Sequence, residues 1–336
     1  MGLPIPEPLL SLTDAGLYCP AGGFHIDPVR PVERAVITHG HADHCRPGHR
    51  AILATPETLA IAEVRYGADA FGETEALTYG EVLSRGGVSL RFAPAGHVLG
   101  SAQVVIERAG ERAVVSGDYK RRPDPSCTPF ELVPCDLFVT EATFGLPVFR
   151  HPEPGAEIAR LLASRETFPE RCHAVGVYAL GKAQRLIMEL RAAGYDRPIW
   201  LHGALEKLCA LYEDWGRQMG ELRQATVAEA KTLKGEIVLA PPGALADRWA
   251  RRLPDPVICA ASGWMQVRQR AKQRGVELPM VISDHADWDE LTATIRETGA
   301  REVWVTHGAE EALVHWCTER QISARPLSLL GREDED

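Results

Sequence analysis

The sequence lacks three features that would assign it to a simple class. None of its eight cysteines belongs to a Cys-x-x-Cys pair, and no apolar run is long enough to cross a membrane. The first residues contain no basic region ahead of an apolar stretch, so no export signal is visible. Scattered cysteines are typical of buried thiols in a reducing compartment. We therefore expect a cytoplasmic protein that has no contact with a membrane.

Positive charge is also scarce. The chain has 37 Lys and Arg residues against 46 Asp and Glu residues, and its formal net charge is −9. This balance argues against a protein that coats nucleic acid without specificity, although it permits a locally basic groove. The chain has 336 residues, 45% of them hydrophobic and 25% charged. That is enough for one large or two ordinary globular domains with their own cores.

Residues able to bind metal, in contrast, are concentrated in one stretch. Residues 38–44 read Thr-His-Gly-His-Ala-Asp-His and directly follow the apolar run 35–37. An extended segment that ends in a tight turn can direct His39 and His41 at one cation while Asp43 and His44 face another. Imidazole nitrogen and carboxylate oxygen are ligands of zinc. A surface histidine cluster is the alternative, but it fits poorly after a strand that looks buried. The stretch therefore predicts two metals in one cavity.

Other chemically active residues stand at the ends of apolar runs. Five such runs end at His39, Asp118, Glu141, His285 and His307. Near-continuous Val, Ile and Leu runs are typical of strands that are covered on both faces. If the strands lie side by side, these ends converge on one sheet edge.

Two further positions are candidates for supporting this edge. His97 lies in a glycine-flanked loop between two predicted strands. Asp27 closes an apolar strand before the metal-binding stretch, where it could either hold a ligand histidine or form an Asp-Pro turn. Near the C-terminus, Asp287 with Glu290 predicts a helix start, and Gly299 predicts its end.

The middle of the chain has a different pattern. Between residues 146 and 280, predicted strands alternate with helical stretches, which is the pattern of a parallel α/β sheet. Candidate sheet-edge residues occur both before and after this block. We therefore expect a discontinuous first domain at 1–145 and 281–336, with residues 146–280 inserted into it.

Together, these stretches resemble a known family. The His-x-His-x-Asp-His stretch, the Gly-His97-Val-Leu-Gly-Ser-Ala loop and Ser-Gly-Asp118 resemble the metallo-β-lactamase fold, an αββα sandwich with a dinuclear metal site. Four later stretches resemble its β-CASP nuclease branch, in which a parallel α/β cap domain is inserted: Thr-Glu141-Ala-Thr, Gly-Lys182-Ala-Gln-Arg, Ser-Asp-His285-Ala-Asp and Thr-His307-Gly. Over almost its whole length the chain is most similar to the bacterial ligase-associated DNA exonucleases.

The resemblance implies two divalent metal ions and a set of ligands. One metal would be held by His39, His41 and His97, the second by Asp43, His44 and His307, with Asp118 as a bridge. Zinc suits these ligands best, and manganese or iron also fits them. Within the family pattern, Asp43 is one of the catalytic residues, His285 protonates the leaving oxygen, and Glu141 orients His285.

This chemistry predicts a phosphodiesterase. Two neighbouring cations can hold a hydroxide and stabilise both the attacking and the departing oxygen of a phosphodiester. A departing sugar oxygen is a poor leaving group unless an acid protonates it. We expect a DNA exonuclease that acts in repair before ligation, with 5′ to 3′ polarity suggested by related exonucleases. DNA is the expected partner, and a DNA ligase and a helicase are further candidates.

Basic residues outside the metal ligands are candidates for contacting the substrate. Lys182 and Arg185 stand at the start of a predicted helix, where a helix N-terminus and a lysine together favour phosphate. Lys120, in the run Lys-Arg-Arg just beyond Asp118, could add positive charge at the edge of the site, where it would contact the substrate phosphates.

Three other functions remain open. A histidine at position 307 is typical of RNA-processing β-CASP members, so a β-CASP ribonuclease is the first alternative. A small-molecule metallo-hydrolase could use the same metals, and a catalytically inactive scaffold is the third alternative.

Overall fold

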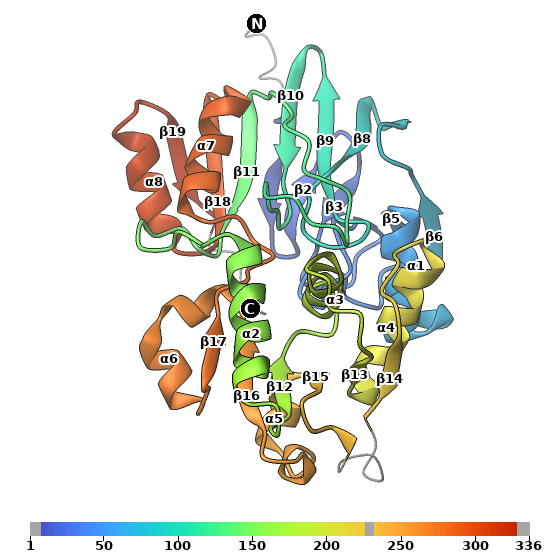
Figure 1. Cartoon of the computed structure of the whole chain (residues 1–336). Helices are drawn as coiled ribbons and strands as arrows, with labels where there is room; N and C mark the ends of the chain where they lie inside the picture. Colours follow the sequence, from blue (N-terminus) through green and yellow to red (C-terminus); the bar gives the residue numbers. More distant parts are fainter. Residues whose placement is uncertain (1–7, 226–231, 328–336) are drawn as a thin grey trace, which may run out of the picture. The chain divides into compact units, whose positions relative to one another are not determined.

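The computed structural model describes residues 8–225 and 232–327, which form two compact units (Figure 1). Within the described residues, the first unit comprises 8–123, 127–148 and 285–327, and the second comprises 124–126 and 149–284. The short segment Asp124–Ser126 thus groups with the second unit although its neighbours on both sides belong to the first. Among the described residues, no helix combines the length and the apolar character that a membrane span requires.

The first unit contains two sheets. The six-stranded sheet has the order β1-β2-β3-β4-β5-β6, and the seven-stranded sheet has the order β19-β18-β11-β10-β9-β8-β7. The strands of the first sheet are β1 (Ser11–Thr13), β2 (Gly16–Cys19), β3 (Phe24–Ile26), β4 (Arg34–Val36), β5 (Ala51–Ala54) and β6 (Glu73–Ala76). Those of the second are β7 (Val82–Arg85), β8 (Val88–Pro94), β9 (Ala102–Arg108), β10 (Glu111–Val115), β11 (Leu137–Ala142), β18 (Glu302–Gly308) and β19 (Ser323–Pro326).

The two sheets pack face to face over an apolar core. Ile26 and Val36 of the first sheet share one buried cluster with Leu90, Val104 and Ile106 of the second. Burying each such side chain stabilises the fold by roughly 1.5–3 kcal/mol. Along residues 88–91 of β8, buried side chains alternate with half-buried ones, because one face of the strand packs on this core.

Helices cover the outer faces of both sheets. Helix α1 (Pro56–Tyr66) packs Ala62 against Ile37 and Ile52 beside the first sheet. Helix α7 (Trp288–Thr298) packs Leu291 and Ile295 against the seven-stranded sheet, which explains why all six residues of β11 are buried. The remaining helical elements of this unit are η1 (Ala68–Ala70) and α8 (Glu310–Thr318). The predicted αββα sandwich is confirmed.

Helix α7 begins and ends as its sequence predicts. The Asp287 side chain accepts a hydrogen bond from Glu290 N at 3.0 Å, and Glu290 Oε2 accepts one from Asp287 N at 3.3 Å. Gly299 ends the helix in the left-handed conformation, with φ 68°.

The second unit is built on one parallel sheet in the order β14-β13-β15-β12-β16-β17. Its strands are β12 (His173–Gly176), β13 (Ile199–Leu201), β14 (Leu222–Gln224), β15 (Ile237–Ala240), β16 (Val257–Ala261) and β17 (Leu278–Met280). Its helices are α2 (Pro154–Thr167), α3 (Lys182–Ala192), α4 (Gly203–Asp214), α5 (Pro242–Ala246) and α6 (Arg268–Gln273), with short 3₁₀ turns η3 (Ala250–Arg252) and η4 (Gly263–Gln266). The predicted parallel α/β architecture is confirmed.

Candidate metal centre

Strand order brings the predicted metal ligands to one edge of the first unit. Strands β10, β11 and β18 run parallel to one another, so their carboxyl ends lie at the same edge. Asp118 follows β10, Glu141 lies near the end of β11, and His307 lies near the end of β18. The loop after β4 carries the stretch 38–44, and the loop between β8 and β9 carries His97.

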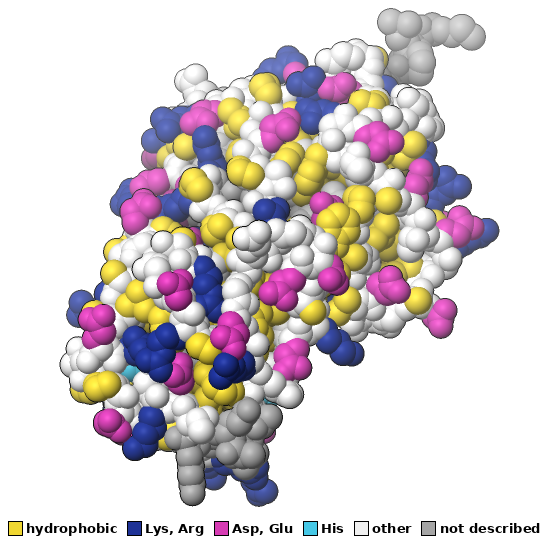
Figure 2. All heavy atoms as spheres, turned by 45° about the vertical axis from the view of Figure 1, so that its right-hand side comes forward, with side chains coloured by type: hydrophobic (Ala, Val, Ile, Leu, Met, Phe, Trp, Pro, Cys, Tyr) yellow, Lys and Arg dark blue, Asp and Glu magenta, His cyan; other side chains and the backbone are white. Residues whose placement is uncertain are grey.

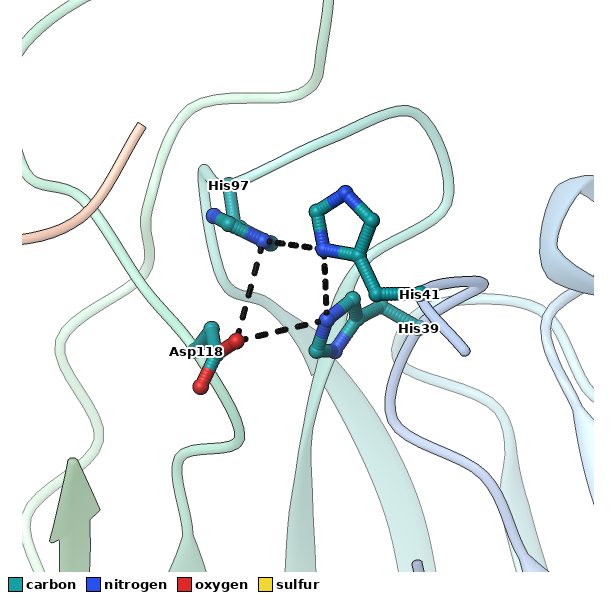
Figure 3. Close-up of side chains that lie close together, drawn as sticks. All are labelled: His39, His41, His97 and Asp118. Atoms are coloured by element: carbon teal, nitrogen blue, oxygen red, sulfur yellow. Dashed lines mark hydrogen bonds and ion pairs between the residues drawn. The ribbon is translucent and has the colours of Figure 1, made fainter. Parts of the chain in front are cut away.

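Four side chains converge in a first donor cluster. His39, His41, His97 and Asp118 have donor atoms that all lie within 4.8 Å of one another. Figure 3 shows the three rings and the carboxylate pointing toward a common centre. Nδ1 of His41 lies 3.1 Å from Nε2 of His39 and 3.0 Å from Nε2 of His97. Because three ring nitrogens and one carboxylate from three chain segments face one another here, the cluster can hold a single cation.

The ring of His39 is neutral and therefore able to bind a metal. Burial holds the pKa of His39 well below its usual value, and the neighbouring His44 lowers it further, while Asp118 opposes the shift. Metal ligation needs an imidazole nitrogen without a proton, so this neutral ring is ready to coordinate.

A second donor cluster adjoins the first. Asp43, His44 and His307 have donor atoms within 4.8 Å of one another. Nε2 of His44 lies 3.1 Å from Oδ2 of Asp43 and 3.2 Å from Oδ2 of Asp118. The same Asp118 oxygen lies 3.4 Å from Nε2 of His39 in the first cluster. Asp118 therefore stands between the two clusters, where a bridging carboxylate would be required.

The charges in the centre favour bound cations. Burial alone lowers the pKa of His44, but the carboxylates of Asp118, Asp43 and Asp27 outweigh burial and hold this pKa well above its usual value. Oδ1 of Asp118 is buried and accepts no hydrogen bond from any residue that the structure describes. A buried carboxylate oxygen without a donor is costly unless a cation compensates it. The residues present thus fit a pair of divalent metals.

Asp27 orients one ring of the second cluster. It is buried, and its Oδ2 lies 2.7 Å from Nδ1 of His44. Its two oxygens also accept hydrogen bonds from the backbone N–H and the hydroxyl of Thr38, at 2.8 Å and 2.6 Å. Of the two alternatives for Asp27, the structure shows the contact with a candidate ligand histidine. The contact turns Nε2 of His44 toward Asp43 and Asp118.

An acid–base pair lies beside the donor clusters. Nδ1 of His285 lies 2.8 Å from Oε2 of Glu141, while Oε1 of Glu141 accepts a hydrogen bond from Tyr119 N at 2.8 Å. Asp118, Glu141 and His285 also have donor atoms within 4.8 Å of one another. Burial raises the pKa of Glu141, and His285 opposes this shift. The Nδ1 contact directs Nε2 of His285 away from Glu141, as a proton donor to a substrate requires.

The three predicted substrate contacts are all buried. Lys120, Lys182 and Arg185 have relative exposures of 1%, 0% and 1%. In the second unit, Nζ of Lys182 donates to the carbonyl oxygen of Ile282 at 2.9 Å, and Arg185 lies 3.2 Å from Asp284. Both cations thus face partners inside the second unit, and their contact with a substrate phosphate stays a prediction. On the face drawn in Figure 2, described Lys and Arg side chains alternate with Asp and Glu side chains.

Sequence reasoning missed the small hydroxyl residues that fix the loops. The hydroxyl of Ser101 accepts hydrogen bonds from the backbone N–H groups of His97 and Val98, each at 3.1 Å. Thr143 Oγ1 lies 3.4 Å from Nδ1 of His285. One feature of the sequence could have identified them: Ser101 and Thr143 lie within a few positions of the predicted site residues His97 and Glu141.

Curated relatives of the chain include nucleases and a ligase. No profile of a known protein family matches it. It is 30% identical over 325 residues to a protein of Opitutus terrae called a probable DNA ligase, a match that covers 92% of this chain and 30% of that protein. It is 29% identical over 242 residues to ribonuclease TTHA0252 of Thermus thermophilus, covering 62% of this chain and 55% of the relative. It is 32% identical over 127 residues to the endoribonuclease YSH1 of Candida glabrata, covering 36% and 16%. The chain thus spans less than two thirds of each relative.

A solved structure shares the fold. The chain resembles the crystal structure of a protein of unknown function from Enterococcus faecalis V583, with a TM-score of 0.60 and 15% identity. The match covers 89% of this chain and 80% of that chain. At this identity the likeness supports the fold alone. The sequence relatives, in turn, show that the chain belongs to the metallo-β-lactamase-fold β-CASP nuclease family.

Proposed function

We propose that the protein is a metal-dependent exodeoxyribonuclease that trims DNA during repair before a ligase seals the strand. The observation that carries this proposal is the position of Asp118, whose Oδ2 lies 3.4 Å from His39 and 3.2 Å from His44. A single carboxylate between two donor clusters suits a pair of metals that act on one phosphodiester. DNA is favoured because the match that covers 92% of the chain is to a protein called a probable DNA ligase.

The metal ligands in this proposal are the two clusters. His39, His41 and His97 would hold one divalent ion, and the other cluster, Asp43, His44 and His307, would hold the second. Nitrogen and carboxylate donors of this kind favour zinc, and manganese or iron would also fit. When bound, the ions supply a hydroxide at neutral pH and stabilise charge on the phosphate oxygens.

The chain itself supplies the proton for the departing oxygen. The Glu141 carboxylate lies 2.8 Å from Nδ1 of His285, and a nearby negative charge raises the proton affinity of an imidazole. As hydroxide adds to phosphorus and the P–O bond breaks, His285 gives the proton on Nε2 to the departing sugar oxygen. The hydrogen bond from Tyr119 N to Oε1 keeps the other Glu141 oxygen directed at His285.

The test is a digest of end-labelled nucleic acids. DNA and RNA of the same sequence, single- and double-stranded, with phosphate or hydroxyl ends, are incubated with zinc, manganese or iron. We expect mononucleotides from DNA, with a 5′ label released first. The matched controls are His285→Ala, which should lose this activity, and Asp69→Asn, which changes an exposed carboxylate far along the chain from the ligands.

Two other outcomes would replace the proposal. Preferential degradation of RNA would support a β-CASP ribonuclease, the candidate favoured by two relatives that are named ribonucleases. Hydrolysis of a chromogenic ester or lactam without nuclease activity would support a small-molecule hydrolase. In the cell, we propose a cytoplasmic protein whose partners are a DNA ligase and, as a further candidate, a helicase.

A further inference from the structure

The chain segment that leads to His285 is held by two buried cations of helix α3. Lys182 donates from Nζ to the carbonyl oxygen of Ile282 at 2.9 Å and lies 3.3 Å from the Asp284 carboxylate. Arg185 donates from its guanidinium to the carbonyl oxygen of Ser283 and lies 3.2 Å from Oδ1 of Asp284. Each of the three residues before His285 is therefore bound by a cation of the same helical turn.

Arg185 also binds a second short segment of the same unit. Nε of Arg185 lies 3.5 Å from Asp124, whose Oδ1 accepts hydrogen bonds from both the backbone N–H and the hydroxyl of Ser126, at 2.8 Å and 2.7 Å. The Glu189 carboxylate is 3.7 Å away on the next turn of the helix. Buried charges persist when they are paired in this way. Arg185 is thus a fixed interior charge that has three carboxylates around it.

The residues after His285 are held in the first unit. Ala286 N donates to the carbonyl oxygen of Tyr119 at 2.6 Å. Arg122 lies 2.9 Å from Oδ2 of Asp287, whose other oxygen caps helix α7. The main chain is therefore held immediately before and immediately after His285.

We propose that Lys182 and Arg185 are positioning residues for the general acid. By holding residues 282–284, they keep His285 where its ring meets Glu141 and its Nε2 can protonate the departing oxygen. Displacing a reacting group by about 1 Å lowers a rate by about 100-fold, so such a support has a large kinetic effect. This inference rests on the proposed function and assigns to both residues a task other than phosphate contact.

The test compares two substrates in one preparation. A DNA strand loses a strongly basic sugar oxygen that needs a proton, whereas bis(p-nitrophenyl) phosphate loses p-nitrophenolate, a weak base that departs without one. For Arg185→Met, we expect kcat on DNA to fall by about 100-fold while the rate on the aryl ester stays within about twofold of wild type. Since both rates come from one sample, a partly unfolded preparation changes them equally and leaves their ratio unchanged.

Further variants sharpen the comparison. Asp284→Asn keeps the side-chain shape but removes the charge, and it should show the same selective loss on DNA. Arg185→Lys restores the charge and should recover part of the rate. Arg191→Met is the matched control, since Arg191 lies on the same helix and donates to main-chain carbonyls of Met219 and Tyr195. Its substrate ratio should equal that of the wild type.

Four results would overturn the inference. An equal loss on both substrates would mean that Arg185 only maintains the fold. A raised KM for DNA with an unchanged kcat would mean that it contacts phosphate. If His285→Ala loses DNA hydrolysis selectively while Arg185→Met and Asp284→Asn do not, the acid does not depend on this support. A wild-type protein that hydrolyses neither substrate would overturn the proposed function, and this inference with it.

Discussion

Asp118 shows how one residue can serve two donor clusters. Burial raises the pKa of its carboxyl group, but His44 and the other surrounding histidines outweigh burial and hold this pKa well below its usual value. The group is therefore ionised in the interior. An ionised carboxylate that is surrounded by imidazole nitrogens is a ligand already in the protonation state that a metal requires.

The first prediction concerns the substitution of Asp118 by asparagine, an amide of the same shape. Asp118→Asn keeps the packing but loses the charge that both clusters share, so the bound metal per chain should fall and hydrolysis should drop at least about 100-fold. Metal is measured by mass spectrometry after dialysis, and rates are measured on labelled DNA. Asp69→Asn, at an exposed site, should leave both quantities unchanged. Full metal content and full activity in Asp118→Asn would contradict the bridging role.

The second prediction concerns His49, which is 1% exposed and whose Nδ1 accepts a hydrogen bond from Val32 N at 3.3 Å. Burial lowers the pKa of His49 from 6.5 to about 4. Between these two values the unfolded chain binds more protons than the folded protein. His49 therefore does not lower the free energy of unfolding above pH 6.5, and it lowers this free energy progressively as the pH falls toward 4.

Urea unfolding of the metal-free wild type and of His49→Asn checks this expectation. Asparagine retains an acceptor near the Nδ1 position but does not titrate. The stability advantage of the wild type over the variant should shrink by about 1–2 kcal/mol between pH 7.5 and pH 5. An advantage that stays constant over this range would show that His49 has an ordinary pKa in the folded protein.

At the scale of elements, the N-terminus of helix α1 supports the loop that carries His97. The hydroxyl of Thr55, which caps the helix by accepting from Thr58 N at 3.2 Å, donates to the carbonyl oxygen of Gly100 at 2.7 Å. Gly100 has φ +76°, and a Cβ there would lie 2.6 Å from Cβ of Glu57 and 2.8 Å from Thr58 N. The loop can therefore approach the helix this closely only with glycine at this position.

The third prediction uses this close approach. Gly100→Ala should lower the free energy of unfolding by about 2–4 kcal/mol, because it combines strained backbone with a clash against a helix terminus. It should also weaken zinc binding by moving His97, which a competition titration measures. Gly110→Ala is the matched control, since Gly110 has φ +87° but nothing within 4 Å of an added Cβ. It should lose only about 1 kcal/mol and bind zinc normally. Equal zinc affinities in the two variants would argue against a role for the loop packing.

At the scale of the whole molecule, the donor clusters couple folding to metal. The three groups of candidate donors all belong to the first unit, where residues far apart in the sequence meet only after folding. Because the unfolded chain lacks this arrangement, a metal that binds the folded protein stabilises it by mass action.

The fourth prediction concerns the effect of metal on thermal stability, which calorimetry measures. Removing metal with a chelator should lower the Tm of the first unit, and restoring zinc at 100 times its Kd should add about 2.7 kcal/mol of stability, somewhat less if the unfolded cysteines and histidines bind zinc. Two compact units can unfold in separate transitions, and only one of them should then respond. Asp118→Asn should respond less than the wild type. An identical scan with and without metal would contradict a resident metal in these clusters.

The local features of this protein could be predicted from the order of its residues. The spacing of His39, His41, Asp43 and His44 forces four donors into one turn, and the capping pair Asp287 and Glu290 predicts the start of α7. Apolar runs likewise predicted buried strands, including β11 and β18. These features depend on neighbours a few positions away, which a sequence displays directly.

Contacts between residues far apart in the chain, which the family resemblance implied for the metal ligands, are visible only after folding. His97 lies 56 positions from His41, yet their ring nitrogens are 3.0 Å apart. Arg185 was predicted from the sequence to contact the substrate, but it is buried beside Asp284, which lies 99 positions later in the chain. A cation is buried or exposed according to whether carboxylates surround it, and strand order and chain crossings set those partners. The spacing of residues along the chain does not reveal these partners.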